Sequence, residues 1–410
     1  MSSTYTDSRP IIEYDPHAPI TDALIAEIAE HILNSPVNDT LFTQGSSVVD
    51  IRTSLECVPY AVRGELADMV LHRSVNFMQQ LPGGSYTYNV NVRARLRDAV
   101  IEKIKPELPP LSAVARHPVI TPSGSVITRS GYDLETDTYV ALHPALETAL
   151  EVVLNDKYSV PLQPTAEDVV RARTTLEELL EYNAFNSRED HARYCAAVLT
   201  PMMRSCFAGA PMVYCAGYTY NNDGYSLAQE IATLCRGTDI ASSAASGIDD
   251  LSLVCSNAWD KGETVLYNVW PVEKTRTAKV VREDLLAPRV TGRTAKYTRA
   301  KGVRNYLTLF YGQDGFDVAE CLRDVTLSVV LEWEGKAGYK PSCFFKPKAA
   351  DYQEYRAEFF AALLILFRAW SQAGEPAPAV QAEWSFADEL DEWYFYVGGI
   401  LDYAGLPRIV

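Results

Sequence analysis

Residues 211–236 read PMVYCAGYTYNNDGYSLAQEIATLCR, and this stretch decides the fold class. It begins as an apolar, strand-like run, continues through a polar loop rich in Gly, Asn and Asp, and ends in a helical pattern. A helix that follows such a loop presents its first backbone N–H groups to a bound anion. The order of the three parts therefore predicts a loop that cradles phosphates, although Gly/Asn/Asp clusters between a strand and a helix are often ordinary loops.

The predicted loop lacks the lysine that a nucleotide-binding P-loop places beside its Ser or Thr. Tyr225 stands at that position, whereas Gly217, Gly224 and Ser226 are suitable for the turn and for a metal-binding hydroxyl. The lysine normally stabilises negative charge on the transferred phosphoryl group, so its absence predicts impaired chemistry. ATP with Mg²⁺ is the candidate ligand if binding has been retained, and the sequence indicates no other cofactor.

The composition is that of a globular protein with more than one domain. The chain has 410 residues, of which 47% are hydrophobic and 22% are charged. Its longest apolar run, 359–367, is too short to cross a bilayer, and the first ten residues lack the apolar segment of a signal peptide. We therefore expect a cytoplasmic protein without a membrane partner. The eight cysteines form no C-x-x-C pair, which favours buried, reduced thiols over zinc or disulfides.

Charge is distributed unevenly along the chain. The net charge is −16, yet residues 274–304 hold ten Lys or Arg against two acids. Such an asymmetry indicates one surface that meets phosphates. The alternative is a solvated basic hairpin that pairs with Glu177, Glu178 and Glu181 of the same or a neighbouring subunit. The candidate DNA-binding residues are Lys274, Arg276, Lys279, Arg289, Arg293, Lys296, Arg299, Lys301 and Arg304.

Hydrophobic periodicity predicts an α/β core with a parallel-type sheet, and the candidate phosphate loop makes the expected fold class an α/β P-loop NTPase-like core. An α+β N-terminal domain at 1–158, with a β-meander at 116–142, precedes this core at 159–350, and a helical region at 351–410 follows it. The expected helices are 20–33, 60–80, 90–104, 166–182, 188–206, 351–373 and 385–404. The expected strands are two within 40–51, then 213–216, 264–269 and 306–311.

Two stretches outside the loop resemble one family. Residues 117–140, HPVITPSGSVITRSGYDLETDTYV, resemble the segment P-V-x-x-x-D-G-x-x-x-x-x-x-G-Y-D-x-x-T-G-x-Y of the helicase-like part of primase-helicase and replication proteins from bacterial phages and mobile elements. LILFRAWSQAG at 364–374 and VGGILDYAGLP at 397–407 resemble the closing helices of those proteins. The family is a P-loop ATPase group related to AAA+ and superfamily-three helicases.

The resemblance implies where catalytic residues would lie. Asn268 matches the strand position of the acid that binds Mg²⁺, and Gln313 matches the polar strand tip that senses the γ-phosphate. Arg323 stands alone where a pair of arginines is common, and residues 286–294 match another segment that supplies arginines. With Tyr225, these changes predict very poor or absent ATP hydrolysis.

The sequence therefore predicts a helicase-like, ATPase-deficient protein of a phage or mobile element that acts in DNA replication or DNA handling. Single-stranded DNA would bind through 274–304, and the resemblance implies a homo-oligomeric ring. One alternative is a non-catalytic scaffold that binds a protein partner on its acidic faces. Another is a divergent but active DNA-dependent ATPase in which a basic residue of 274–304 replaces the lysine. The six histidines are scattered, so no metal site and no catalytic triad are predicted.

Overall fold

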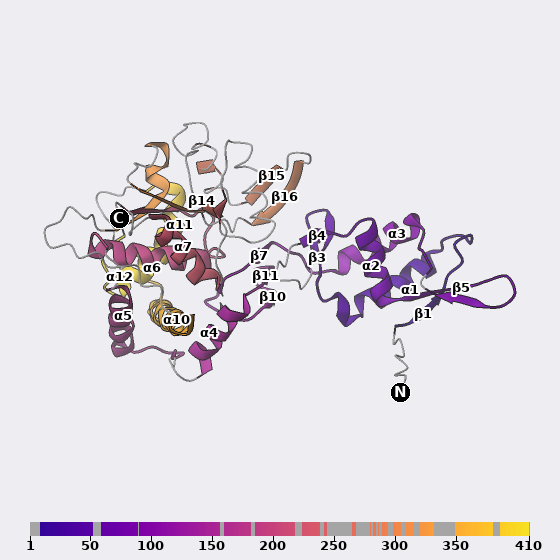
Figure 1. Cartoon of the computed structure of the whole chain (residues 1–410), viewed down its shortest axis with the longest axis horizontal. Coiled ribbons are helices and arrows are strands. Elements are labelled where there is room, and N and C mark those ends of the chain that lie inside the picture. The colour runs from indigo at the N-terminus through magenta and orange to yellow at the C-terminus, as the bar shows by residue number, and fades with distance from the viewer. Residues whose placement is uncertain are drawn as a thin grey trace. The chain divides into compact units, whose positions relative to one another are not determined.

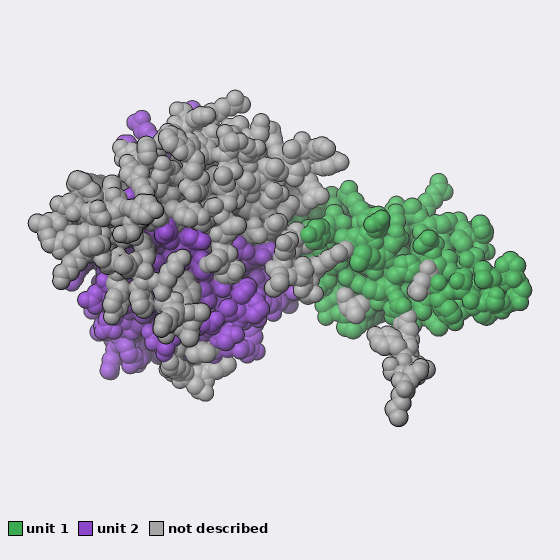
Figure 2. Space-filling view, in the orientation of Figure 1, with its two compact units in different colours: residues 1–112 green, residues 113–410 purple. Residues whose placement is uncertain are grey.

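The computed structural model divides the chain into two compact units, residues 1–112 and 113–410 (Figure 2). Each unit has its own hydrophobic core, and the two cores share no residue. The structure describes residues 9–51, 59–88, 90–155, 160–181, 185–217, 224–237, 242–243, 265–267, 279, 282–283, 286, 289–293, 298–304, 309–314, 320–331, 349–379 and 386–409.

The described part of unit 1 packs three helices against two small sheets (Figure 1). Strand β1 runs parallel to β5, which forms an antiparallel hairpin with β6, while β2, β3 and β4 form an antiparallel sheet. The elements are β1 Ile11–Glu13, α1 Asp22–Leu33, β2 Leu41–Gln44, β3 Ser47–Ile51, β4 Pro59–Ala61, α2 Glu65–Ser74, β5 Asn76–Gln80, β6 Tyr86–Tyr88 and α3 Ala94–Ile104, with 3₁₀ turns at Pro36–Asn38 and Lys105–Glu107.

The single helix expected over 60–80 is wrong, because the segment forms β4, α2 and β5. Gly64 has a φ of 54°, which a helix interior does not allow, so α2 begins after it. Val75 is extended, and pairing with β1 then buries Phe77 beside Tyr14. Burial of these side chains outweighs the helical spacing around them.

Unit 2 begins with the stretch expected as a β-meander. Its strands are β7 Ala113–Ala115, β8 Val119–Ile120, β9 Val126–Ile127, β10 Gly131–Asp133 and β11 Thr138–Val140. They form two antiparallel hairpins, β8–β9 and β10–β11, but β11 pairs in parallel with β7. Val119, Ile120 and Val140 are buried in the core of unit 2. The unit boundary therefore lies at 112/113 and not near 158.

The centre of unit 2 is a five-stranded sheet in the order β13-β14-β17-β12-β18, in which every pair is parallel. Its strands are β12 Met212–Gly217, β13 Ser242–Ser243, β14 Val265–Tyr267, β17 Leu309–Asp314 and β18 Thr326–Val330. All six residues of β12 are buried, as expected for an inner strand of a parallel sheet covered on both faces. A separate antiparallel hairpin joins β15 Arg289–Arg293 to β16 Thr298–Arg304.

Helices pack around this sheet (Figure 1). Helix α7 Gly224–Arg236 lies against β12 and β17, and α6 Arg188–Met202 lies against β18 and α7. Helix α10 Ala349–Gln372 packs on α4 Pro144–Asn155 and α5 Ala166–Leu180, and a 3₁₀ helix, η4 Glu320–Val325, precedes β18. The helices of 351–410 share one core with the sheet and form no separate domain.

The last expected helix, 385–404, is interrupted. The chain forms η5 Asp388–Leu390, α11 Asp391–Trp393, a π-helix at Tyr394–Gly398 (η6) and α12 Gly399–Tyr403. Trp393 Nε1 donates to Thr200 Oγ1 at 2.9 Å, and a Cβ atom on Gly399 would lie 2.9 Å from Trp370 Nε1. Within the π turn, the rings of Phe395 and Tyr396 pack edge-on against Trp370. Among the described residues, no helix combines the length and apolarity needed to span a membrane.

Candidate functional site

The residues that flank the predicted phosphate loop lie at the carboxyl edge of the parallel sheet. Strand β12 ends at Gly217, and α7 begins at Gly224. Residues 218–223, between them, lie outside the described residues. Because all strands of the sheet run the same way, the ends of β12, β14, β17 and β18 share this edge. Open parallel sheets place ligands at their carboxyl ends.

The residues on both sides of the loop are fixed by burial. The apolar run of β12 is buried between β17 and β18, and α7 places one apolar stripe against the sheet. The buried side chains of that stripe are Leu227, Ala228, Ile231, Ala232, Leu234 and Cys235. The start of α7 therefore has a defined position at the sheet edge. Its first N–H groups carry the positive end of the helix dipole.

The structure brings three of the predicted nucleotide-binding residues to this edge. Gly217 and Gly224 are buried, and Ser226 is half-buried in the first turn of α7. Tyr225 also lies in that turn, and its side chain is outside the described part of the structure. The arrangement can hold an anion with backbone N–H groups and can offer a hydroxyl, and the sequence places no lysine in the turn.

Strand β17 brings two polar residues beside the loop. Gln313 pairs with Ala216, and Asp314 pairs with Gly217. Gln313 therefore takes the strand-tip position implied by the resemblance, whereas Asn268 lies outside the described residues. Sequence reasoning missed Asp314, although an acid at the end of the strand-like stretch LFYGQD, 309–314, is a signal for this edge. Asp314 places the backbone of a carboxylate-bearing residue next to the loop.

Arg323 lies at the opposite edge of the sheet. It is exposed in η4, just before Thr326, which pairs with Met212 at the start of β12. The five residues of β18 span about 17 Å, so one strand length separates Arg323 from the carboxyl edge. The structure does not bring Arg323 together with Gly217 and Gly224 of the same chain.

Part of the basic segment forms the β15–β16 hairpin. Arg289 stands opposite Arg304, and Arg293 stands opposite Thr298. Arg299 and Lys301 lie on β16 as well, which places five candidate residues on one two-stranded ribbon. Lys279 is exposed outside the hairpin. Lys274, Arg276 and Lys296 lie outside the described residues.

Arg282 belongs to the same basic segment, but its side chain is held in contacts within the protein. Its guanidinium forms an ion pair with Asp324 and donates to the Cys321 carbonyl at 3.2 Å. The hydrogen bond to Asp324 raises the pKa of Arg282, with burial opposing the shift. Arg282 thus ties the segment to η4, and we do not count it among residues available to a ligand.

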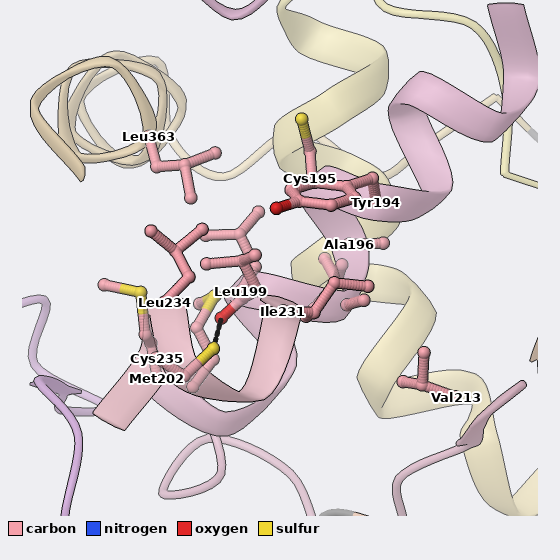
Figure 3. Close-up of a cluster of buried hydrophobic side chains, with 14 of the residues drawn as sticks. Tyr194, Cys195, Ala196, Leu199, Met202, Val213, Ile231, Leu234, Cys235 and Leu363 are labelled. Carbon is pink, nitrogen blue, oxygen red and sulfur yellow. Dashed lines mark hydrogen bonds between the residues drawn. The ribbon is translucent and has the colours of Figure 1, made fainter. Parts of the chain in front are cut away.

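Three buried titratable side chains of unit 2, Cys195, Cys235 and His117, are held in their neutral forms. Cys195 and Cys235 are fully buried in the core of unit 2, and Cys235 Sγ lies 4.0 Å from the Val198 carbonyl oxygen (Figure 3). Burial raises the pKa of each thiol to about 12, so both stay protonated. Burial likewise lowers the pKa of His117 to about 4 and keeps that imidazole neutral. The described residues contain no group of three or more His, Cys, Asp or Glu that could hold a metal ion.

Comparison with known proteins adds no relative. No protein-family model matches the sequence, and no curated protein matches it significantly. The site must therefore be interpreted from its own geometry and from the chemistry of its residues.

Proposed function

We propose that this chain is a helicase-like protein that retains a phosphate-loop architecture, has lost ATP hydrolysis and acts on DNA in a phage or mobile element. One observation carries the proposal. The segment between Gly217 and Gly224 joins the inner strand of a wholly parallel sheet to the start of a 13-residue helix, at the carboxyl edge of the sheet.

The strand order supports a ligand at this edge. Strand β12 precedes the other four strands in the chain, yet it lies between β17 and β18. The connection from β12 leads to β13 at one edge of the sheet, and the connection from β17 passes β12 to reach β18 at the other. The connections from the strands therefore run to opposite sides of the sheet at β12. Open α/β sheets bind ligands at such a topological switch point.

Loss of hydrolysis follows from the missing charges. Tyr225 brings no cation to the β and γ phosphates, and Asn268 brings no negative charge to a metal ion. Removing one oriented electrostatic group from a catalytic site typically lowers kcat by about 10²- to 10³-fold. Two such losses would reduce turnover to near the background rate.

The basic hairpin supports a DNA partner. The register of β15 and β16 places five of the candidate basic residues on one two-stranded ribbon, a concentration of positive charge that suits a phosphate backbone. Because Arg323 lies at the far edge of its own sheet, an arginine at this position would act on the loop of a neighbouring subunit. A homo-oligomer of cytoplasmic subunits is therefore part of the proposal, together with a preference for single-stranded DNA.

Purified full-length protein tests the hydrolysis half of the proposal. We expect binding of a fluorescent ATP analogue with no phosphate release above background, with or without single-stranded DNA. Tyr225→Lys alone should not restore turnover, because Asn268 still provides no metal ligand. Clear turnover in the wild-type protein that Ser226→Ala abolishes would contradict the proposal.

Asp314 favours a second candidate, a divergent active ATPase. Its position beside Gly217 would allow a carboxylate to replace the acid missing at Asn268. A basic residue of 274–304 would then replace the lysine. In that case wild-type turnover would be measurable, and Asp314→Asn would abolish it without loss of folding.

The DNA half is tested by the salt dependence of binding. Affinity for single strands should fall steeply with added salt, because each neutralised phosphate releases counterions. Replacing Arg293, Lys296 and Arg299 together by Ala should flatten this slope. The control changes three exposed arginines elsewhere, Arg129, Arg171 and Arg408, and should leave the slope unchanged. Absence of DNA binding at low salt would favour the interaction scaffold.

A further inference from the structure

Unit 1 contains a basic segment that is separate from the hairpin of unit 2. Residues 73–97 hold four arginines and no acid, in a chain with 53 acids and a net charge of −16. Between Arg73 and Arg93 there is no charged residue at all. The uncharged stretch forms the β5–β6 hairpin, which Figure 1 shows extending beyond the helices of unit 1.

Two tyrosines lie exposed on one face of this hairpin. Tyr86 and Tyr88 are each 50% exposed and are separated by one residue, so both side chains point to the same face of the strand. Their cross-strand partners are Gln80 and Met78. Phe77 is fully buried on the other side of β5. The hairpin is thus anchored by one face and offers an aromatic pair on the other.

The arginines around the hairpin differ in how they are held. Arg73 pairs with Asp50 at 3.0 Å, Arg97 pairs with Asp68 at 2.8 Å, and Arg93 donates to the Ala18 carbonyl. Arg95, in the first turn of α3, is exposed and forms no ion pair within the described residues. It is therefore the cation of this segment that is available to a phosphate.

We propose that Tyr86 and Tyr88 stack on unpaired bases of single-stranded DNA, with Arg95 contacting the backbone. The inference rests on the proposed function for the identity of the nucleic acid. Stacking needs only a ring face for each base and tolerates any sequence, and neither strand of the hairpin carries an acid that would repel a polyanion. A stable protein–protein interface buries about 800 Å² of surface on each partner. The half-exposed rings of Tyr86 and Tyr88 beside the Gln80 amide provide far less.

The test measures binding of fluorescein-labelled oligo-dT to the full-length protein by anisotropy. Typical stacking contributions predict that Tyr86→Ala/Tyr88→Ala weakens binding by at least about 30-fold. Tyr86→Phe/Tyr88→Phe should bind as wild type, since the rings are kept. Thr87→Ala, between the two tyrosines and on the opposite face, is the matched control and should have no effect. Arg95→Ala should reduce the salt slope by about one.

A second measurement uses only the wild-type protein and so does not depend on whether the variants fold. Photo-cross-linking of an iodouracil-substituted strand to the wild-type protein should place a cross-link at Tyr86 or Tyr88. Wild-type DNA binding with no cross-link there, or with unchanged affinity in the double Ala variant, would overturn this inference and leave the proposed function standing. Loss of self-association in that variant, with DNA affinity intact, would assign the face to a second copy of the chain. No DNA binding by the wild-type protein would overturn both proposals.

Discussion

The two units place similar aromatic residues in opposite situations. In unit 2, Trp370 and Trp393 are fully buried, and Phe386 and Tyr394 are buried beside them in the same core. In unit 1, Phe77 is buried while Tyr86, on the adjacent strand, is half exposed. The contrast teaches that an aromatic residue serves core packing or surface binding according to its position relative to the core, more than according to its residue type.

The largest expected effect tests whether the two cores are independent. Trp393→Ala removes a buried indole, its contact with Phe386 and its hydrogen bond to Thr200. Such truncations cost about 3–5 kcal/mol of unfolding free energy. Denaturant unfolding should therefore show a large shift in the transition of unit 2 and none in that of unit 1.

Phe77→Ala is the reciprocal variant. It opens a cavity in the core of unit 1 beside Tyr14 and His72, with a similar expected cost. Only the transition of unit 1 should move. A single transition that both variants shift equally would show that the two units unfold as one cooperative structure.

The sequence predicted the elements that carry a strong periodic signal. Strand β12 and helices α5 and α10 lie within a few residues of their expected bounds, because long apolar patterns and the cap at Thr165 define them. The strand at 76–80 and the π turn at 394–398 could not be predicted in this way. Both depend on tertiary contacts, namely pairing with β1 and close packing against Trp370.

The candidate site was predictable in part for the same reason. Gly217 and Gly224 mark the two ends of the loop, and glycines at such positions can be identified from the sequence alone. The position of Asp314 beside Gly217 depends on the pairing of β12 with β17, which are far apart in the chain. The placement of Arg323 at the opposite edge likewise requires the register of β18.

A smaller effect is expected from histidine titration, and it should again separate the units. Burial lowers the pKa of His117 in unit 2 to about 4, with smaller contributions from Arg236 and Arg204. The unfolded chain, with a histidine pKa of about 6.5, binds the proton first as the pH falls. The stabilisation is therefore complete above pH 6.5 and is lost as the pH drops to about 4, by about 3 kcal/mol in total.

Unfolding measured between pH 7 and pH 5 tests this. His117→Gln should flatten the pH dependence of unit 2, whatever its effect on stability at pH 7. Burial also lowers the pKa of His72 in unit 1, but the charge of Asp68 opposes the shift. His72→Gln should therefore change the slope of unit 1 less than His117→Gln changes that of unit 2. Equal slopes in wild type and His117→Gln would contradict the assignment of a buried, neutral His117.

The smallest expected effect compares one helix cap from each unit. In unit 2, Thr165 accepts from the Asp168 N–H at 3.2 Å, and Asp168 accepts from the Thr165 N–H at 2.8 Å, so α5 has a reciprocal capping box. In unit 1, Thr21 only accepts from the Leu24 N–H at 3.2 Å. Thr165→Ala should cost about 1 kcal/mol, and Thr21→Ala should cost less, because in α5 the substitution also frees the Asp168 side chain that holds the cap backbone. Thr165→Ser keeps the hydroxyl and should behave as wild type. Equal costs for the two Ala variants would show that the hydrogen bond from Thr165 Oγ1 to the Asp168 carboxylate adds nothing to the cap.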